Sequence, residues 1–185
     1  VHVPIDRNPR PMSSAILDDL SEAERLMLLR SYPLDSPDVR AQLDRLARLA
    51  ARICETPVAL VSIVEDDRQI FIGRTGTDLE QTPRDWSFCQ HAMMETHGMT
   101  VGNAERDARF SDNPLVTDAP GIRFYAGCPL TVANGSKLGT LCVFDVKPRS
   151  FSEEDRALLR DLARMVEEEL AAVALANMDE LTQVS

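Results

Sequence analysis

Residues 86–93, with the sequence WSFCQHAM, place a cysteine and a histidine two positions apart among aromatic side chains. A thiol next to an imidazole base can act as a nucleophile, and the same two groups can belong to a metal site or anchor a cofactor. A nucleophile and its base must lie within hydrogen-bond reach. On a helix, positions two apart point about 200° apart around the axis. The spacing of Cys89 and His91 therefore argues against a catalytic pair within this segment.

Arg123 and Tyr125 are a second pair whose chemistry suits ligand binding. They follow a long loop and enter a predicted strand, where alternate residues share a face and Phe124 takes the opposite one. If Phe124 packs in the core, the guanidinium and the phenol point toward a pocket and can hold an anionic or polar ligand. In the alternative interpretation, Arg123 pairs with Asp112 or Asp118 and holds the loop in place.

The cysteines and histidines do not form a metal-binding pattern. The four cysteines are widely separated, at positions 54, 89, 128 and 142. They show neither the C-x-x-C spacing of zinc or redox sites nor the density of a secreted disulfide scaffold. His2 and His97 are the other histidines, and neither has a zinc-type spacing to a cysteine. We therefore expect reduced thiols, a cytoplasmic protein and no bound metal.

The composition argues against several classes of protein. The chain has 185 residues and a formal net charge of −10, from 20 basic and 30 acidic residues. Such a chain lacks the basic surface that nucleic acids and anionic membranes require. The longest apolar run, residues 57–64, is too short for a membrane span, which needs about 20 residues. We expect neither a nucleic acid nor a membrane among the partners.

Hydrophobic periodicity and turn residues predict the elements that position these side chains. In order, they are a flexible leader (1–20), a short helix opened by a capping box (21–24), an amphipathic helix (from 38), a hairpin (57–65 and 69–76), a helix (from about 85), a strand (99–104), a long loop (105–121), a hairpin (122–132 and 137–146) and a long helix (152–177). Strands joined by tight turns are antiparallel, and the terminal helices must bury their apolar stripes on one face of the sheet. The predicted fold class is therefore α+β.

Six phrases in the order of these elements resemble a GAF domain, the small-molecule-sensing module of signalling proteins. They are PVALVSIVEDDRQIF, SFCQHAM, ARFSDNPLV, IRFYAGCPL, GTLCVFD and PRSFSEED. The resemblance implies an antiparallel sheet of about six strands. It also implies that the N- and C-terminal helices cover one face, and that a ligand pocket lies on the other, roofed by residues 80–125. We therefore assign residues 21–175 to a GAF-like sensor domain of a bacterial signalling protein.

Residues 176–185, ANMDELTQVS, resemble the start of a GGDEF diguanylate cyclase domain, whose opening helix typically carries Asp-x-Leu-Thr. Here that motif is Asp179, Leu181 and Thr182. We expect these residues to be a linker and the truncated start of such a domain, with no catalytic loop. The implied downstream partner is a GGDEF-like domain that makes cyclic di-GMP.

The resemblance also implies that WSFCQHAM is one wall of the sensor pocket. The residues expected to line this pocket are Phe71, Trp86, Phe88, Cys89, His91, Arg123, Tyr125 and Cys128. Gln90 follows Cys89, whereas in phytochrome-like members the bilin-bearing cysteine is followed directly by histidine. The Asn-Lys-Phe-Asp-Glu signature of cyclic-nucleotide-binding members is absent. Family members hold cyclic nucleotides, bilins, haem, other small molecules or nothing, so the identity of any ligand or cofactor stays open.

Three functions are compatible with this resemblance. The favoured one is a regulatory input domain without catalytic residues, which binds a small molecule and passes a signal through its C-terminal helix. An alternative is a free methionine-R-sulfoxide reductase, a GAF-fold enzyme that uses cysteines, although the chain lacks that family's Gly-His-Ile-Ala-Cys segment. The third is a ligand-free dimerisation module.

Apolar residues continue along the last helix after the predicted sheet has ended. Helices seldom leave a row of such residues in water, and a second copy of the same helix is a suitable cover. We therefore expect a homodimer whose interface includes Val173, Leu175 or Met178. The first helix is expected to join this bundle near Leu26 and Leu29.

Overall fold

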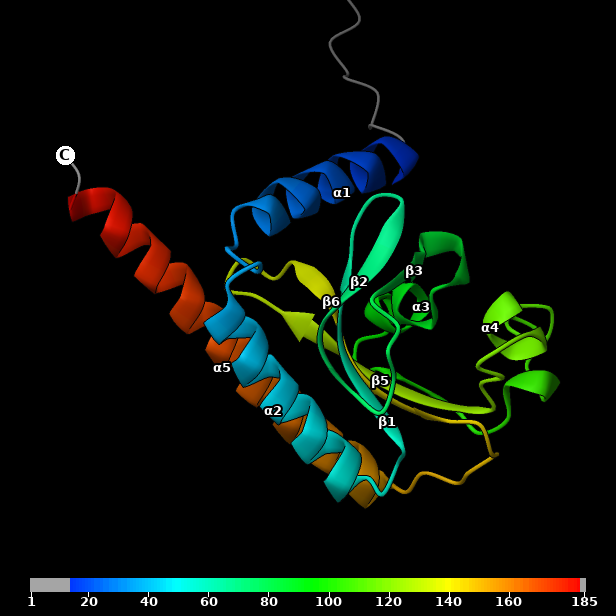
Figure 1. Ribbon diagram of the computed structural model, residues 1–185. Helices are drawn as coiled ribbons and strands as arrows, with labels where there is room; N and C mark the ends of the chain where they lie inside the picture. The colour runs from blue at the N-terminus through cyan, green and yellow to red at the C-terminus, as the bar shows by residue number, and fades with distance from the viewer. Residues whose placement is uncertain (1–13, 184–185) are drawn as a thin grey trace, which may run out of the picture.

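The structure of the chain is a computed structural model that describes residues 14–183, and its centre is one antiparallel sheet (Figure 1). Six strands follow the order β3-β2-β1-β6-β5-β4. Their bounds are β1 Val58–Val64, β2 Arg68–Thr75, β3 Gln81–Pro83, β4 Met99–Val101, β5 Phe124–Thr131 and β6 Lys137–Asp145. The predicted α+β class and the antiparallel six-stranded sheet are confirmed. Residues 1–13 of the expected leader lie outside the described residues.

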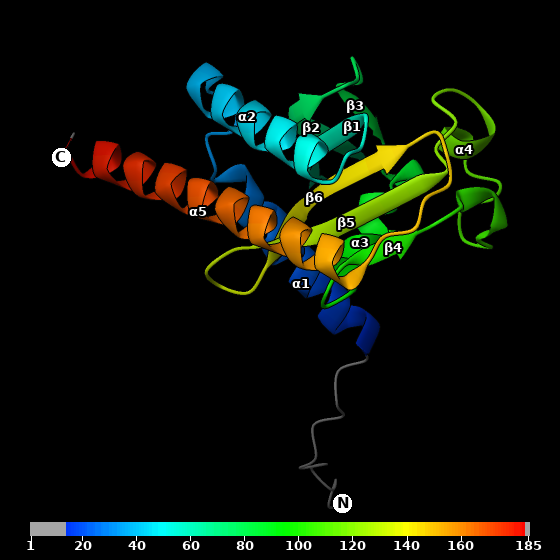
Figure 2. The ribbon, with the colours of Figure 1, turned by 90° about the horizontal axis from the view of Figure 1, so that it is seen from below.

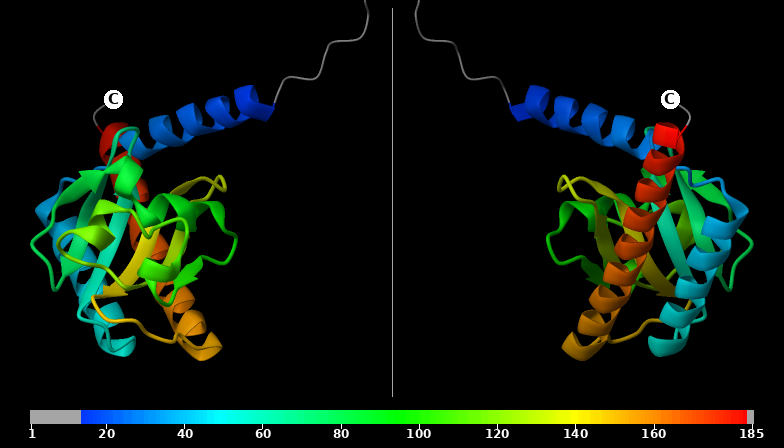
Figure 3. Two further views of the ribbon diagram at one scale, coloured as in Figure 1. Left: turned by 90° about the vertical axis from the view of Figure 1, so that its right-hand side faces the viewer. Right: turned by 90° about the vertical axis from the view of Figure 1, so that its left-hand side faces the viewer.

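Helices cover both faces of this sheet. The α-helices are α1 Ser14–Arg30, α2 Pro37–Ile53, α3 Phe88–Met94, α4 Pro114–Thr117 and α5 Glu153–Gln183, and the 3-10 helices are η1 Arg84–Trp86 and η2 Ala104–Arg106. Two further directions of view show α2 and α5 side by side across one face, with α3 and α4 over the other (Figures 2 and 3). The pair α2 and α5 and the expected pocket region therefore lie on opposite sides of the sheet.

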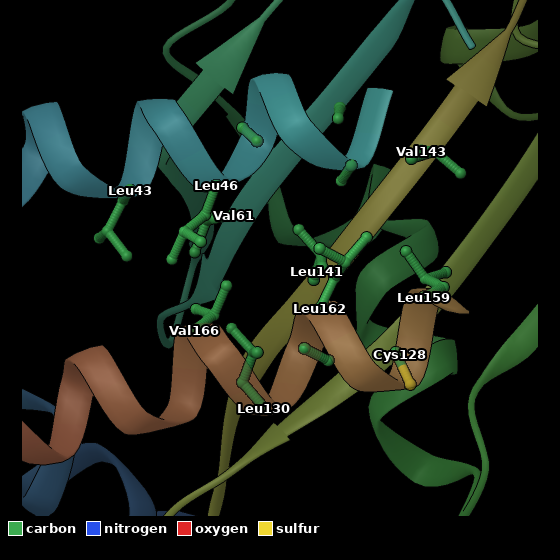
Figure 4. Packing of buried hydrophobic residues seen from close by; sticks show 14 of the residues in the cluster. Leu43, Leu46, Val61, Cys128, Leu130, Leu141, Val143, Leu159, Leu162 and Val166 are labelled. Carbon is green, nitrogen blue, oxygen red and sulfur yellow. The ribbon is translucent and has the colours of Figure 1, made fainter. Parts of the chain in front are cut away.

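The face under α2 and α5 holds the larger of two apolar cores (Figure 4). The predicted stripe of α5 is buried along its whole length, at Leu159, Leu162, Val166, Leu170 and Val173. It packs with Leu43 and Leu46 of α2 against alternate residues of the central strands. Each leucine that is fully removed from water contributes roughly 1.5–3 kcal/mol, so this stripe is the main attachment of α5 to the sheet. Val173 is thereby buried within a single chain, which leaves Leu175 and Met178 of the expected dimer interface exposed.

α5 is capped at its start and continuous to the end of the described chain. Ser152 Oγ accepts a hydrogen bond from the Asp155 backbone N–H (3.1 Å), and the Asp155 carboxylate accepts one from the Ser152 N–H (3.0 Å), which is a reciprocal capping box. The helix reaches Gln183 without a break, so the described part of the expected linker is helical. No helix within residues 14–183 combines the length and apolar character needed to cross a membrane.

α1 begins at Ser14, seven residues before the predicted capping box at residue 21. Residues 14–20 of the expected leader are therefore helical. Their sequence, SAILDDL, contains no proline or glycine that would stop a helix, so the capping-box motif lies inside the helix instead of at its start. The prediction placed the boundary at the stronger motif, and the structure places it earlier.

Residues 105–121, which lie between β4 and β5, were predicted as one loop, and the structure shows short helices there. α4 lies within this stretch and is opened by Asn113, whose side chain accepts a hydrogen bond from the Leu115 N–H (2.9 Å) before Pro114 at the first helical position. η2 is capped in the same way by Asn103. Elements of three or four residues have too few positions to show a periodicity, and β3 at the edge of the sheet was missed for the same reason.

Candidate functional site

The face of the sheet opposite α2 and α5 brings sulfur and polar side chains together at its centre. In strands, residues two apart share a face, so Thr140 and Cys142 of β6 point the same way. Ser62 of β1 is the register partner of Thr140. Tyr125 of β5 belongs to the same buried cluster as Cys142. This centre carries hydroxyl and thiol groups among its apolar residues.

α3 covers this centre and directs Cys89 into it. Ser87 caps the helix by accepting a hydrogen bond from the Gln90 N–H (3.0 Å), which fixes the rotation of the helix about its axis. Cys89 is then buried against the sheet, whereas His91 is half-buried on another side and meets the ring of Phe110 edge-on, with 5.0 Å between ring centroids. The two side chains have separate partners, as their spacing predicts. Burial and the positive charge of Arg109 lower the pKa of His91.

Cys89 and Cys142 form a buried pair of thiols. Their Sγ atoms are 3.9 Å apart, and the Tyr125 hydroxyl donates a hydrogen bond to the sulfur of Cys89 at 3.3 Å. Both cysteines are reduced, and each is at most 3% exposed. One sulfur comes from the short helix α3 and the other from the central strand β6, so the pair bridges the roof and the floor of the site.

The buried side-chain amide of Gln69 links the polar side chains of this centre by hydrogen bonds. Gln69 Oε1 accepts hydrogen bonds from Ser62 Oγ (3.1 Å) and Ser87 Oγ (2.7 Å), and its Nε2 donates to Thr82 Oγ1 (2.5 Å). All four residues are buried. The network joins β1, β2, β3 and the cap of α3, and therefore fixes the height of α3 above the sheet.

The two thiols differ in acidity. Burial alone raises the pKa of Cys89, but the thiol of Cys142 and the hydroxyl groups of Ser62, Thr140 and Tyr125 favour the thiolate and bring the pKa of Cys89 to about 6. Cys142 shows the opposite behaviour, because its hydrogen bond to Cys89 and its burial raise the pKa of its thiol well above the usual value. Burial and the neighbouring sulfur charges also raise the pKa of Tyr125. Cys89 is therefore the more acidic thiol of the pair.

The cavity between α3 and the sheet is small. It has a volume of about 20 Å³ and is bounded by Phe71, Phe88, Cys89, Tyr125 and Cys142, among others. That is the space of about one water molecule, whereas pockets for metabolite-sized ligands have roughly 300–1,000 Å³. The remaining space is filled by aromatic rings. Phe88 stacks on Phe110 with 4.1 Å between centroids and lies 5.1 Å from the ring of Tyr125.

Of the expected pocket residues, four line this cavity: Phe71, Phe88, Cys89 and Tyr125. Trp86 does not line it, because the residue is 38% exposed on the outside of η1. The Trp86 carbonyl accepts a hydrogen bond from the Asn113 side chain (3.1 Å), so this residue holds the α4 segment against η1. His91 does not line the cavity either, and its ring contacts Phe110, which stacks on Phe88.

Arg123 is also outside the cavity, so the expected pairing with Tyr125 in one pocket is wrong. Its guanidinium donates to the carbonyls of Val116 (2.9 Å) and Ile122 (3.1 Å) and forms an ion pair with Glu105 (2.6 Å). A charged group needs several acceptors, and the loop supplies them where the apolar cavity does not. The alternative role of holding the loop is the one observed, with Glu105 in place of the aspartates that were considered.

Cys128 was assigned to the wrong face of the sheet. It lies three residues after Tyr125 on the same strand, so strand alternation turns the two side chains to opposite faces. It belongs to the same apolar core as Leu159 of α5 (Figure 4). Burial raises the pKa of Cys128 to about 11. Beside it is a groove of about 670 Å³ between the β4–β5 edge and α5, lined by Arg156, Arg160 and others.

The residues that sequence reasoning missed are the polar partners of Cys89. Cys142 was predicted only as a reduced thiol, and Ser62, Gln69 and Thr140 were not considered. A signal was present, because Ser62 interrupts the apolar run 57–64 and a polar residue inside a fully buried strand needs a partner. Among the residues that the structure describes, no three histidine, cysteine or acidic side chains lie close enough to hold a metal ion.

Comparison with known proteins identifies related sequences and folds. A family model described as GAF domain matches residues 38–170. A cyclic di-GMP phosphodiesterase of Pseudomonas aeruginosa is 41% identical over 150 residues. That match includes 73% of this chain and 26% of the relative, so the chain spans about a quarter of the relative's length.

Solved structures share the fold at low sequence identity. The GAF domain of a phosphoenolpyruvate-protein phosphotransferase from Coxiella burnetii superposes with a TM-score of 0.63 at 14% identity, over 90% of this chain and 99% of that one. The free methionine-R-sulfoxide reductase from Neisseria meningitidis, in complex with its substrate, gives a TM-score of 0.62 at 17% identity, over 91% and 97% of the two chains. At these identities the likeness describes the fold alone.

Proposed function

Because this chain belongs to the GAF domain family of signalling sensor modules, we propose that it senses a small molecule at the α3 site and passes the signal through α5 to an output domain that turns over cyclic di-GMP. The observation that carries the proposal is the position of α5. It packs on the sheet directly behind the site and then continues to Gln183. A regulatory module needs such a connection between its site and its output domain.

A single layer of strands separates the cavity of the site from α5. Tyr125 and Cys142 face the cavity, whereas their neighbours in sequence, Ala126 and Leu141, face the core under α5. Packed interiors have little free volume, so a shift of β5 or β6 must be taken up by the residues of α5 that touch it. This arrangement supports transmission from the cavity to the helix without a mobile loop.

The output end of α5 supports a role in dimerisation with a second copy of this chain. Leu175, Met178 and Leu181 are 64%, 62% and 70% exposed, at the spacing of one helix face. The Asn177 side chain donates to the carbonyl of Ser31 (3.4 Å), which brings the end of α1 to the same place. A parallel pair of α5 helices would cover the apolar row and carry a change in helix angle to the output domain.

The output chemistry is proposed at the level of cyclic di-GMP turnover. The residues Asp179, Leu181 and Thr182 resemble the start of a diguanylate cyclase domain, and the Pseudomonas relative is a phosphodiesterase. Both activities act on the same second messenger. We further propose a cytoplasmic location, which four reduced cysteines support.

Sedimentation equilibrium at micromolar concentration tests the dimer. Met178→Glu is expected to give a monomer that keeps its fold, because a charge cannot be buried in an apolar helix pair. Met94→Glu is the matched control, since Met94 is 80% exposed but belongs to α3, and it should leave the dimer intact. In a longer protein with the output domain attached, Met178→Glu should also remove regulation of cyclic di-GMP turnover. A wild-type monomer with normal regulation would refute the proposed route.

A second candidate function is a thiol enzyme that reduces free methionine sulfoxide. The pair Cys89 and Cys142 favours it, because such a reaction needs a nucleophilic thiol and a second thiol to resolve it. The cavity of about 20 Å³ disfavours it, since an amino acid does not fit there. Release of methionine from methionine sulfoxide, dependent on Cys89, would establish this activity.

A further inference from the structure

We propose that Cys89 and Cys142 are a redox-active dithiol which hydrogen peroxide converts to a disulfide, and that this oxidation is the signal sensed at the α3 site. The role of the oxidation as the signal rests on the proposed function, whereas the formation of the disulfide does not. The geometry that carries it is the pair of sulfurs 3.9 Å apart, on two different elements, at the edge of a cavity with space for about one water molecule.

The two sulfurs are close to bonding distance. A disulfide bond is about 2.05 Å long, so they must approach by about 2 Å. Cys142 lies on β6, which is held by strands on both sides, whereas Cys89 lies on a helix of seven residues. The approach must therefore move α3 and not the sheet. α3 carries Phe88, so disulfide formation also moves the aromatic stack with Phe110.

The surroundings of Cys89 stabilise negative charge on its sulfur. The Tyr125 hydroxyl already donates to it at 3.3 Å. Thr140 Oγ1 is fully buried and makes no hydrogen bond in the described chain, although a buried hydroxyl without a partner costs about 1–3 kcal/mol. It lies on the same face of β6 as Cys142, where it can turn toward a thiolate at Cys89. An unused donor beside two thiols indicates a site arranged for an anionic state.

The reaction balances with hydrogen peroxide as the oxidant. The Cys89 thiolate attacks one peroxide oxygen, the O–O bond breaks, and the leaving hydroxide takes up the proton that Cys89 lost on ionising, which gives water and a sulfenic acid. Cys142 then loses its proton and attacks the Cys89 sulfur, and the departing hydroxide takes that proton as a second water. Two thiols and one peroxide become one disulfide and two waters, with two electrons passing from sulfur to oxygen.

The size of the cavity selects the oxidant. A molecule of two oxygen atoms is little larger than the water-sized space, whereas an alkyl hydroperoxide or a sulfoxide amino acid exceeds it several-fold. Leu79 forms part of the cavity wall and is only half-buried. The other residues that line the cavity are buried, so Leu79 marks the side of the cavity that lies nearest to solvent.

Two other cysteines of the chain, Cys54 and Cys128, are internal controls for the oxidation of Cys89. Cys54 and Cys128 are also buried, but burial raises the pKa of each to about 11, and among the described residues the thiol–thiol hydrogen bond is the one between Cys89 and Cys142. The thiolate is the species that reacts with peroxide, so these two cysteines should remain reduced where Cys89 is oxidised.

Intact-mass spectrometry after peroxide treatment and alkylation tests the dithiol. The wild-type chain should form one disulfide, with two cysteines protected from alkylation and peptide mapping linking Cys89 to Cys142. Cys89→Ser should form none, and Cys142→Ser should stop at a sulfenic acid on Cys89 that dimedone traps. Cys54→Ser and Cys128→Ser should behave as wild type. A wild-type chain that stays fully reduced, or that links any other pair, overturns the proposal.

Two further outcomes separate this site from the proposed function. If the disulfide forms but turnover of cyclic di-GMP by the longer protein is unchanged, the dithiol stands and its role as the signal fails. If free methionine sulfoxide oxidises the pair faster than peroxide and releases methionine, the site is a reductase and the sensing proposal is overturned. A disulfide that forms with peroxide, changes the turnover of cyclic di-GMP and is reversed by dithiothreitol supports both the redox-active dithiol and its role as the signal.

Discussion

Gly127 lies directly beneath the side chain of Tyr125, and the two residues are two positions apart on the same strand. A Cβ atom placed on Gly127 would lie 2.2 Å from the Tyr125 hydroxyl oxygen and 2.7 Å from the ring carbon that bears it. Only glycine therefore allows the tyrosine to lie flat along β5 and reach Cys89. The hydrogen bond between Tyr125 and Cys89 thus depends on a residue that touches neither thiol.

Gly127→Ala is expected to displace the Tyr125 hydroxyl from Cys89. Crowding of this kind typically costs about 1–3 kcal/mol of unfolding free energy. Loss of the donor should also raise the pKa of Cys89, measured as a shift of the pH profile of alkylation to higher pH. Tyr125→Phe removes the hydroxyl alone and should raise the pKa with a smaller loss of stability. An unchanged alkylation profile in both variants would contradict the role of Tyr125.

The acidity of Cys89 is expected to be independent of His91. The imidazole meets Phe110 edge-on and is not among the groups that lower the pKa of Cys89. His91→Ala should therefore leave the pH profile of Cys89 alkylation in place. Ser62→Ala is the contrasting variant, because the Ser62 hydroxyl is among the groups that lower the pKa of Cys89, and it should move the profile to higher pH. If the alkylation profile shifts in His91→Ala alone, the result would contradict this expectation and support a functional pair of Cys89 and His91.

Much of the fold could be predicted because it depends on local patterns. The stripe of α5 repeats every three or four residues over several turns, and Asn134-Gly135 marks a hairpin without reference to the rest of the chain. The site depends on which strands become neighbours, and Gln69 joins Ser62 to Thr82 across three strands. No local pattern in the sequence predicts these hydrogen bonds, because they depend on how the three strands pair. Cys128 is different, because alternation along β5 was sufficient to place it opposite Tyr125.

Glu22 is expected to make the attachment of α1 dependent on pH. Hydrogen bonds and charge from Arg25 and Arg84, set against partial burial, lower its pKa to about 2. Arg25 is 6% exposed and also donates to the carbonyl of Val64 (2.8 Å), which anchors α1 to the end of the sheet. Because the folded-state pKa is depressed, the carboxylate stabilises the fold fully above its unfolded value near 4.5. This contribution is lost as the pH falls from there toward 2.

Urea unfolding at pH 7 and pH 3 measures this contribution. Glu22→Gln should lower the unfolding free energy at pH 7 by about 1 kcal/mol, a value discounted because the carboxylate is about a third exposed. The difference from wild type should shrink at pH 3. Glu24→Gln is the matched control, since Glu24 is exposed on the same helix, and it should change little at either pH. Equal effects of the two substitutions would show that Glu22 does not anchor α1.

Phe110 is expected to control access to the thiols. It is 1% exposed and stacks on Phe88, and its removal leaves a hollow beside the cavity of about 20 Å³. Phe110→Ala should lower the unfolding free energy by about 3–5 kcal/mol, the usual cost of deleting a buried phenyl ring. It should also speed oxidation of Cys89 by peroxide, because the roof of the site becomes looser. Phe124→Ala deletes a ring that is 0% exposed on the opposite face of the sheet, and it provides the comparison at similar stability. If both substitutions speed oxidation equally, the thiols are reached by general unfolding. If only Phe110→Ala does so, the aromatic stack is the barrier that sets the rate at which this site responds.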